Sequence, residues 1–325
     1  MMGMTRRAAN QVAMALCAAM MLVSAPFLEA QEFPAKVIRI ATAEAGGGSD
    51  FMSRILAKGL SGSAGWQVIV ENKPGAGIVS EYVARSTPDG YTLLLNGSTI
   101  WLGPLMLESV RYDPERDFLP VTMTHRTNNI LVVHPGVSAK TVKDLIDMAK
   151  AGAAKVDYAS ANLGSTSHLS AELFNSMAGI SMRRIPYKGT SGALTAVMSG
   201  EVQVMFASAS SASPLVRSGK LRGLAVTSEQ PSELFPGLPT VASTVKGYEA
   251  VQIYGVFVPA RTPQSVINRL NQELVRVIKS PEHRDVFRNA GVEAVGSTPE
   301  YLGTAVKADI ARMGKLVREA GIKEQ

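Results

Sequence analysis

The chain has 325 residues, 46% of them hydrophobic, and its 33 basic and 27 acidic residues give a formal charge of +6. A chain of this length and composition can bury two hydrophobic cores. The basic residues are spread along the chain, with no run of Lys and Arg longer than the pair Arg183-Arg184. This distribution suits a small acidic ligand and excludes the concentrated basic surface that binds nucleic acid.

The N-terminus has the pattern of a secretory signal peptide. Arg6 and Arg7 precede an apolar run from Val12 to Val23, and small residues end at Ala30. The run is shorter than the roughly 20 apolar residues of a permanent membrane anchor, and no later segment is apolar for long enough to span a bilayer. We predict that residues 1–30 are cleaved and that the protein is exported to the periplasm. The single cysteine, Cys17, lies in this segment, which excludes disulfide and thiol chemistry in the remainder.

Short apolar segments alternate with helical patterns such as Thr141–Lys150. The segments predicted to be strands are Val37–Ala41, Val68–Glu71, Thr92–Leu95, Ile130–Val133, Val156–Ala159, Val202–Phe206 and Leu224–Val226. Stretches marked by Gly and Pro, at Pro236–Gly247 and Pro259–Pro263, interrupt the alternation, and the last part, Pro263–Glu319, is predicted to be helical. The alternation predicts an α/β protein with parallel sheets covered by helices.

Two segments share one design, in which an apolar strand leads through a loop of Gly and Ser into an amphipathic helix. The first loop is Gly46-Gly47-Gly48-Ser49-Asp50, and the second is Ala161-Asn162-Leu163-Gly164-Ser165. A strand that ends in glycines at a helix start leaves backbone N–H groups unpaired, and the helix dipole favours negative charge there. Two such loops about 115 residues apart predict two lobes that close on one small anion.

Three further features are candidates for the same cleft. Asn96-Gly97-Ser98-Thr99 follows a predicted strand, so its polar groups are expected at the carboxyl ends of the sheet, where α/β proteins bind ligands. His168 lies three residues after Ser165, where it either donates to an anion or completes a hydrogen-bond network at the helix start; we favour the structural role. Asp50 is interpreted as a helix cap or dipole partner.

The sequence contains little that indicates an enzyme. The histidines His125, His134, His168 and His283 show no metal-ligand spacing, and no G-x-S-x-G motif occurs. The first glycine loop follows a strand and Glu71 ends the next one, as in dinucleotide-binding proteins, but the third glycine of that motif is missing. We therefore predict a protein that is not an enzyme and needs no metal or cofactor. A secreted dinucleotide-dependent enzyme is kept as an alternative.

Nine segments, in this order along the chain, resemble the Bug/TctC substrate-binding proteins of tripartite tricarboxylate transporters. They are Gly46-Gly47-Gly48-Ser49-Asp50, Val70-Glu71-Asn72-Lys73-Pro74-Gly75-Ala76-Gly77, Asp89-Gly90-Tyr91-Thr92-Leu93, Gly164-Ser165-Thr166-Ser167-His168-Leu169, Pro186-Tyr187-Lys188-Gly189, Gly219-Lys220-Leu221-Arg222-Gly223-Leu224-Ala225-Val226-Thr227, Leu238-Pro239-Thr240-Val241, Phe257-Val258-Pro259-Ala260 and Leu270-Asn271. The resemblance covers nearly the whole chain after residue 30. It implies a two-lobe periplasmic binding-protein clamshell, in which each lobe is a mixed sheet flanked by helices and two strands cross at the hinge. It also implies capture of a small carboxylate for a membrane permease.

The resemblance also implies ligand-binding residues. Carried over to this sequence, the first loop contributes Ala45, Gly46, Gly47 and Gly48, and the second contributes Ser160, Asn162, Gly164, Ser165 and Thr166. Ser98, Thr99 and His168 complete the candidate set. Glycine allows close approach of an anion, and serine adds a donor without bulk. Neither loop contains Lys or Arg, so we expect backbone N–H groups and small polar side chains to carry binding.

Three positions depart from the family's pattern. Glu44 stands in a loop where the family usually has prolines and an aromatic residue; Ala207-Ser208 stands where the family commonly has Asp; and Arg183-Arg184 begins a strand that usually begins with His. Glu44, Ala207 and Ser208 are included as candidate contacts. Loss of an acid and gain of Arg184 favour a second carboxylate on the ligand, whereas Glu44 opposes it. For Arg184 and Glu44, an exposed position without ligand contact is an equal alternative.

We predict lobe one to be residues 31–128 plus 253–325 and lobe two to be residues 129–252. The expected partners are a small carboxylate, of which we favour a dicarboxylate or an aromatic acid, and the membrane permease subunits, with the protein itself a monomer. An accessory protein that presents the same ligand to a sensor kinase is the main functional alternative.

Overall fold

The computed structural model describes residues 33–43, 48–73, 75–107, 110–152, 156–161, 163–319 and 321–323. The predicted signal peptide lies outside the described residues, as do the predicted ligand contacts Glu44 to Gly47 and Asn162.

Six of the seven predicted strands agree with the structure to within about two residues at each end, whereas the strand predicted at Ile130–Val133 begins at Phe118. The strands are β1 (Ile38–Thr42), β2 (Val68–Asn72), β3 (Thr92–Gly97), β4 (Phe118–Val133), β5 (Asp157–Ser160), β6 (Arg183–Pro186), β7 (Val204–Ser208), β8 (Arg222–Val226), β9 (Val251–Pro259) and β10 (Glu293–Ala294). The helices are α2 (Gly48–Ala64), α3 (Ala76–Ala84), α4 (Thr99–Met106), α5 (Val142–Ala151), α6 (Thr166–Ala178), α7 (Thr190–Met198), α8 (Ala209–Arg217), α9 (Gln264–Ile278), α10 (Pro281–Asn289) and α11 (Pro299–Glu319), with a short 3₁₀ turn at Val241–Ser243.

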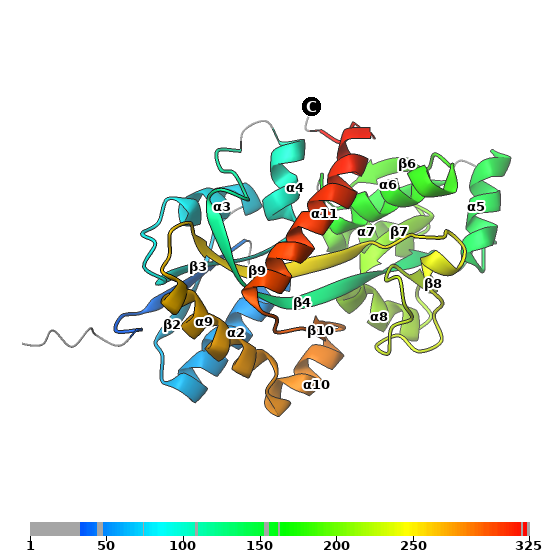
Figure 1. The fold of residues 1–325 in the computed structure, drawn as a ribbon. Helices are drawn as coiled ribbons and strands as arrows, with labels where there is room; N and C mark the ends of the chain where they lie inside the picture. Colours follow the sequence, from blue (N-terminus) through cyan, green and yellow to red (C-terminus); the bar gives the residue numbers. More distant parts are fainter. Residues whose placement is uncertain are drawn as a thin grey trace, which may run out of the picture. The chain divides into compact units, whose positions relative to one another are not determined.

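The strands run as one path in the order β2-β1-β3-β9-β4-β7-β5-β6, with β10 and β8 as further partners of β4 (Figure 1). The pairs β1–β2, β1–β3, β5–β6 and β5–β7 are parallel. Both β9 and β4 run antiparallel to their neighbours. The sheet is therefore mixed, as the family resemblance implied, and the all-parallel arrangement expected from the alternation is wrong at the centre of the path.

The strand β4 joins the two halves of this path. Its first part, Phe118–Asn128, pairs with β9, and its last part, Asn129–Val133, pairs with β7 and β8. The chain returns along β4 as β9, which pairs with it from Val251 onward. Immediately before β9, the Ala250 N–H donates to the Thr227 carbonyl (2.9 Å). Two neighbouring segments thus cross between the β1–β3 half and the β5–β7 half, and Figure 1 shows β4 and β9 side by side at this crossing.

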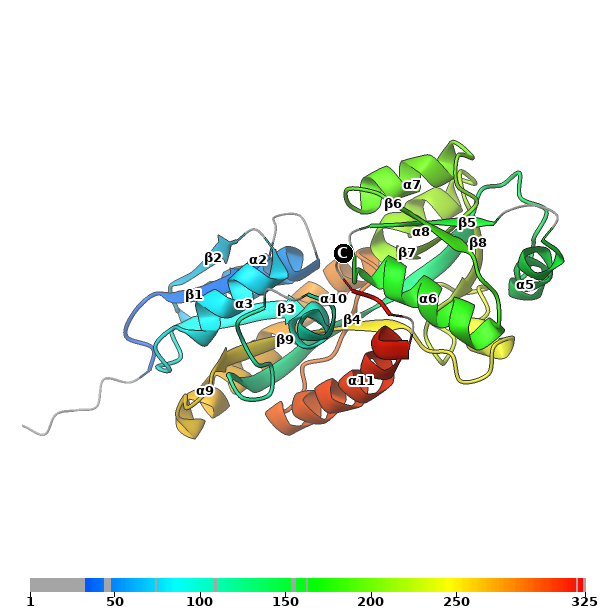
Figure 2. The same cartoon turned by 90° about the horizontal axis from the view of Figure 1, so that it is seen from above.

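The central strands are buried on both faces because their side chains alternate between two cores. In β7, Val204 and Phe206 pack in one cluster with α6, whereas Met205 and Ala207 pack in another with α7 and α8. Figure 2 shows α6 on one side of these strands and α7 and α8 on the other. The loops that follow these buried strands are thus carried on a packed framework.

Candidate functional site

A cavity of about 700 Å³ lies where the loops that follow β1 and β3 meet the second glycine loop. The described lining residues come from both halves of the sheet path and from β9: they are Ala43, Gly48, Ser49, Gly75, Gly77, Ile78, Glu81, Asn96, Thr99, Gly103, Met106, Leu107, Val110, Arg111, Tyr112, Leu163, Ser165, Gln252 and Tyr254. The cavity therefore combines a polar end, built from helix starts and amides, with an apolar wall.

Helix starts supply the polar end of this cavity. Gly48 and Ser49 begin α2, Thr99 begins α4, and Ser165 is the N-cap of α6, whose side chain accepts from the His168 N–H (3.4 Å). The first N–H groups of a helix have no partner within the helix, and the dipole favours an anion beside them. Starts of helices from both halves of the fold therefore face one cavity.

Tyr254 forms part of the wall between these helix starts. A Cβ on Gly48 would lie 2.9 Å from its hydroxyl oxygen, and a Cβ on Gly97 would lie 3.1 Å from its ring. The ring also stacks on the buried His125, with centroids 4.2 Å apart and planes 8° from parallel. Burial lowers the pKa of His125 to about 3 and raises the pKa of Tyr254, so both rings are neutral at neutral pH. Glycine at the start of α2 and at the end of β3 leaves the room that the Tyr254 side chain occupies.

The second glycine loop is held in place by hydrogen bonds that its backbone donates to the side chains of His168 and Ser167. The Gly164 N–H donates to Nδ1 of His168 (3.1 Å), and the Ala161 N–H donates to Oγ of Ser167 (3.0 Å). Nδ1 is an acceptor in this arrangement, so neutral His168 carries its proton on Nε2. Burial, with a further contribution from the charge of Arg184, lowers the pKa of His168 to about 4. His168 thus belongs to the network at the start of the helix.

Arg184 also holds the second loop. Its Nε donates to the Ser160 hydroxyl (2.7 Å), and its Nη2 donates to the Ala161 carbonyl (3.1 Å). The sequence left two alternatives for this residue, ligand contact or an exposed position without a role. In the structure the guanidinium instead bonds to the strand end and the loop that carry the predicted ligand contacts.

We expect Arg184→Ala to weaken ligand binding about tenfold, equally for mono- and dicarboxylates, because the loop loses two charged hydrogen bonds and no ligand contact. Calorimetric titration measures the change. The matched control is Arg183→Ala, because the adjacent Arg183 pairs with Asp157 at the surface and should not affect affinity. A loss confined to dicarboxylates would contradict this role and indicate direct contact.

The structure brings together only some of the predicted contacts. Gly48, Thr99 and Ser165 line the 700 Å³ cavity. Ser98 and Thr166 line a smaller gap of about 30 Å³, and Gln252 lines both the gap and the cavity. Ser160, Gly164 and His168 take part in the hydrogen bonds that hold the second loop, and none of them is among the described lining residues. Ala207 and Ser208 end β7, where the Ser208 hydroxyl donates to Ser211, and neither is among the described lining residues.

Gln252 and Tyr254 were missed because β9 was not predicted. The segment Val251-Gln252-Ile253-Tyr254 alternates between apolar residues and residues with a polar end, which is the signal of a strand with one face toward a site. Asn96 was predicted to face the cleft as part of its loop, but it was not among the candidate contacts.

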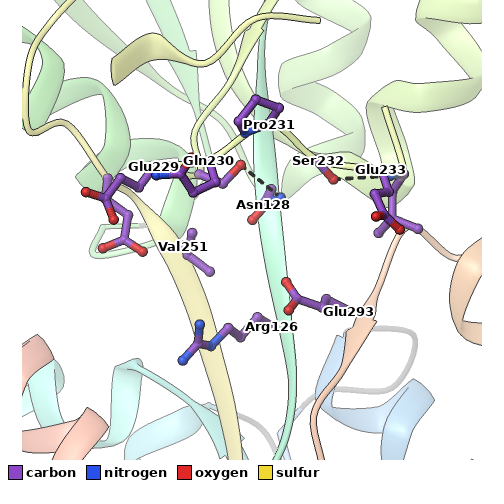
Figure 3. A pocket seen from close by; sticks show the side chains of 12 residues that line it. Arg126, Asn128, Glu229, Gln230, Pro231, Ser232, Glu233, Val251 and Glu293 are labelled. Carbon is purple, nitrogen blue, oxygen red and sulfur yellow. Dashed lines mark hydrogen bonds between the residues drawn. The ribbon is translucent and has the colours of Figure 1, made fainter. Parts of the chain in front are cut away.

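A second cavity, of about 460 Å³, has mostly acidic residues among its charged lining residues (Figure 3). Glu229 and Glu233 of the segment after β8, together with Glu249 and Glu293, line it with Arg126 and Asn128 of β4. Acidic side chains outnumber the basic one among these residues, so an anion is repelled there. The smaller cavity is therefore not the candidate site for a carboxylate.

Glu71, the ribose partner in the dinucleotide alternative, is already engaged. Its carboxylate accepts from Lys73 Nζ (2.8 Å) and from the Tyr82 hydroxyl (3.3 Å), and the hydrogen bond with Lys73 lowers its pKa. Within the described ranges, no group of three or more His, Cys, Asp or Glu side chains is arranged to hold a metal ion. None of the helices in the described part is long and apolar enough to cross a membrane.

Comparisons with known proteins agree with the resemblance seen in the motifs. The family model described as "Tripartite tricarboxylate transporter family receptor" matches residues 52–322. The chain is 33% identical over 309 residues to protein BugT of Bordetella pertussis, an alignment that covers 93% of this chain and 94% of that protein.

Solved structures agree as well. The structure of Rpa4515 of R. palustris with adipate is 31% identical, with a TM-score of 0.81 and coverage of 90% of this chain and 100% of that one. The structure of the periplasmic binding protein BugD is 29% identical, with a TM-score of 0.77 and coverage of 90% and 100%. The predicted two-lobe α/β fold is thereby confirmed.

Proposed function

Since the chain belongs to the tripartite tricarboxylate transporter receptor family, we propose that it captures a small carboxylate in the 700 Å³ cavity and delivers it to the membrane permease of such a transporter. The observation that carries the proposal is the meeting of three helix starts, at Gly48, Thr99 and Ser165, around one cavity. Adipate, the ligand in the Rpa4515 structure, is a dicarboxylate with an aliphatic chain.

The apolar wall favours a ligand with an aliphatic or aromatic body. Met106, Leu107, Val110 and Leu163 line the cavity beside the polar end, so a carboxylate at the helix starts would place its carbon skeleton against them. We therefore keep the preference for a dicarboxylate or an aromatic acid. The described cavity has the volume of sites that enclose small molecules.

We further propose that the lobes are residues 31–128 plus 253–325 and residues 129–252, because β4 changes its pairing partner between Asn128 and Asn129. Opening and closing of the lobes about β4 and β9 would admit and enclose the ligand. Residues 1–30 are proposed to be the signal peptide that exports the protein to the periplasm, where it acts as a monomer without a cofactor.

The proposal predicts that a carboxylate stabilises the protein and that Ser165 contributes to its binding. In thermal-shift and calorimetric titrations with adipate, malate and benzoate, we expect at least one acid to raise the melting temperature, since a ligand at 100-fold its Kd adds about 2.7 kcal/mol of stability. Ser165→Ala should weaken that ligand by roughly 0.5–3 kcal/mol through loss of a hydroxyl donor. Ser232→Ala, in the wall of the acidic cavity, is the matched control.

Absence of stabilisation by any of these acids, or an equal loss in Ser232→Ala, would contradict the proposed site. Delivery is tested separately, by uptake of the labelled acid into cells with and without the gene. Loss of uptake supports transport, whereas unchanged uptake with loss of a ligand-dependent transcriptional response would favour the sensor alternative.

A further inference from the structure

We propose that the side-chain amides of Asn96 and Gln252 both donate hydrogen bonds to the carboxylate of the ligand in the 700 Å³ cavity that the two residues line. This inference rests on the proposed function and deepens it: it adds two residues, one of them on β9, and it states what the ligand must present to them. Because the two amides donate hydrogen bonds, they favour a ligand group that only accepts hydrogen bonds.

Asn96 is the first half of the pair. It is the second-last residue of β3, shortly before the start of α4, and it lines the cavity although it is only 4% exposed. Its Oδ1 accepts from the Gly97 N–H (2.8 Å), which orients the amide. The buried Nδ2 has no hydrogen-bond partner among the described residues. A buried amide with two unused N–H groups is unfavourable unless an acceptor reaches it, so the arrangement calls for a ligand atom or a bridging water there.

Gln252 is the second half. It lies on β9, lines the same cavity, and its Oε1 accepts from the Tyr254 hydroxyl (2.8 Å). With Oε1 held by Tyr254 in this way, Nε2 is the end left for a ligand. The Tyr254 ring is itself held by stacking on His125, and this stacking keeps its hydroxyl in place beside Gln252.

The two amides reach the cavity from the two faces of β3, because the side chains of successive residues in a strand point to opposite faces. The strands β3 and β9 are neighbours, with Asn96 opposite Gly255 and Gly97 opposite Tyr254. A Cβ on Gly97 would lie 2.8 Å from Nε2 of Gln252, so the Gln252 amide lies against the backbone of the residue that follows Asn96. Glycine at this position leaves the space that the Gln252 amide occupies.

This end of the cavity selects by hydrogen-bond type. A carboxylate has two oxygens and accepts from several donors, whereas an ammonium group only donates and would face N–H groups. The acidic residue among the described lining residues, Glu81, is engaged elsewhere: its carboxylate accepts from the Arg111 N–H (3.1 Å) and pairs with Arg85 (3.6 Å). The two amides therefore bind the carboxylate through hydrogen bonds from uncharged donors.

The test replaces each amide by the acid of the same shape. The probe is whichever of adipate, malate and benzoate stabilises the wild-type protein most. We expect Asn96→Asp and Gln252→Glu each to weaken its binding at least 100-fold at pH 7.5 by calorimetry, because a donor becomes a like charge. Asn128→Asp is the matched control, since Asn128 is similarly buried and lines the acidic cavity, where its amide bonds to Ser228 (3.3 Å).

Affinity retained in folded Asn96→Asp and Gln252→Glu, or an equal loss in Asn128→Asp, would overturn the inference. If Asn96→Asp does not fold, Gln252→Glu decides, because Gln252 is only half-buried and the Tyr254 hydroxyl can still donate to the new carboxylate. Failure of the inference is distinct from failure of the proposed function, which would appear as absence of binding to the wild-type protein.

Discussion

Trp101→Ala is expected to lower the free energy of unfolding by about 3–5 kcal/mol, the cost typical of removing a large aromatic side chain from a core. Trp101 is 2% exposed, packs against Phe257 with ring centroids 6.0 Å apart, and donates from Nε1 to Oδ2 of the buried Asp309 (2.8 Å). The substitution leaves a cavity and also removes a donor from a buried carboxylate. The effect is large because this single residue joins α4 to both β9 and α11.

Urea unfolding followed by far-UV circular dichroism measures this change, and two further variants divide it into parts. Trp101→Phe keeps most of the ring and loses the donor, so it should cost about 1.5–3 kcal/mol. In Asp309→Asn the acceptor is uncharged, and Trp101→Phe should then cost less than in the wild-type background. Arg312 remains beside Asp309 in every variant (Nη2 to Oδ1, 3.3 Å), which keeps the carboxylate from being left entirely unpaired. A loss below 1 kcal/mol for Trp101→Ala would contradict the packing seen here.

Local signals in the sequence explain why part of the site was predictable. An apolar strand followed by Gly and Ser and then by a helical pattern shows where the chain turns, and the ends of β1 and β5 lie at the predicted places. Ser165 illustrates the point: its N-cap role follows from its position before the helix, and the cavity position follows from the strand end that precedes it. Such inferences need only interactions between residues that are near in the sequence.

The rest depends on which strands pair, and the sequence does not show this directly. Gln252 reaches the cavity only because β9 lies antiparallel between β3 and β4, although it follows β3 by about 150 residues. Arg184 holds the second loop because β6 pairs with β5 so that Tyr158 lies opposite Arg184, two residues before Ser160. Both roles come from tertiary contacts, and a list of residue types by position cannot specify them.

Acidification from pH 7 to pH 5 is expected to destabilise the protein by about 4 kcal/mol through two buried histidines. Burial lowers the pKa of His125 to about 3 and is the main cause that lowers the pKa of His168 to about 4. In the unfolded chain both pKa values are near 6.5, so between pH 6.5 and pH 4 the unfolded state binds protons that the folded state does not. Stability therefore falls as the pH falls through this window, by about 2 kcal/mol for each histidine down to pH 5.

The variant His125→Phe isolates one of the two contributions. Phenylalanine keeps a ring against Tyr254 and removes Nε2, a buried nitrogen that has no hydrogen-bond partner among the described residues. Thr124 loses its bond to Nδ1 but still donates to the Tyr254 carbonyl (3.2 Å), so stability at pH 7 should change little. Urea unfolding at pH 7, 6 and 5 should then show about half of the wild-type loss, because His168 still contributes. An unchanged pH dependence in His125→Phe would contradict this account, because it would mean that the pKa of His125 is nearly the same in the folded and unfolded states.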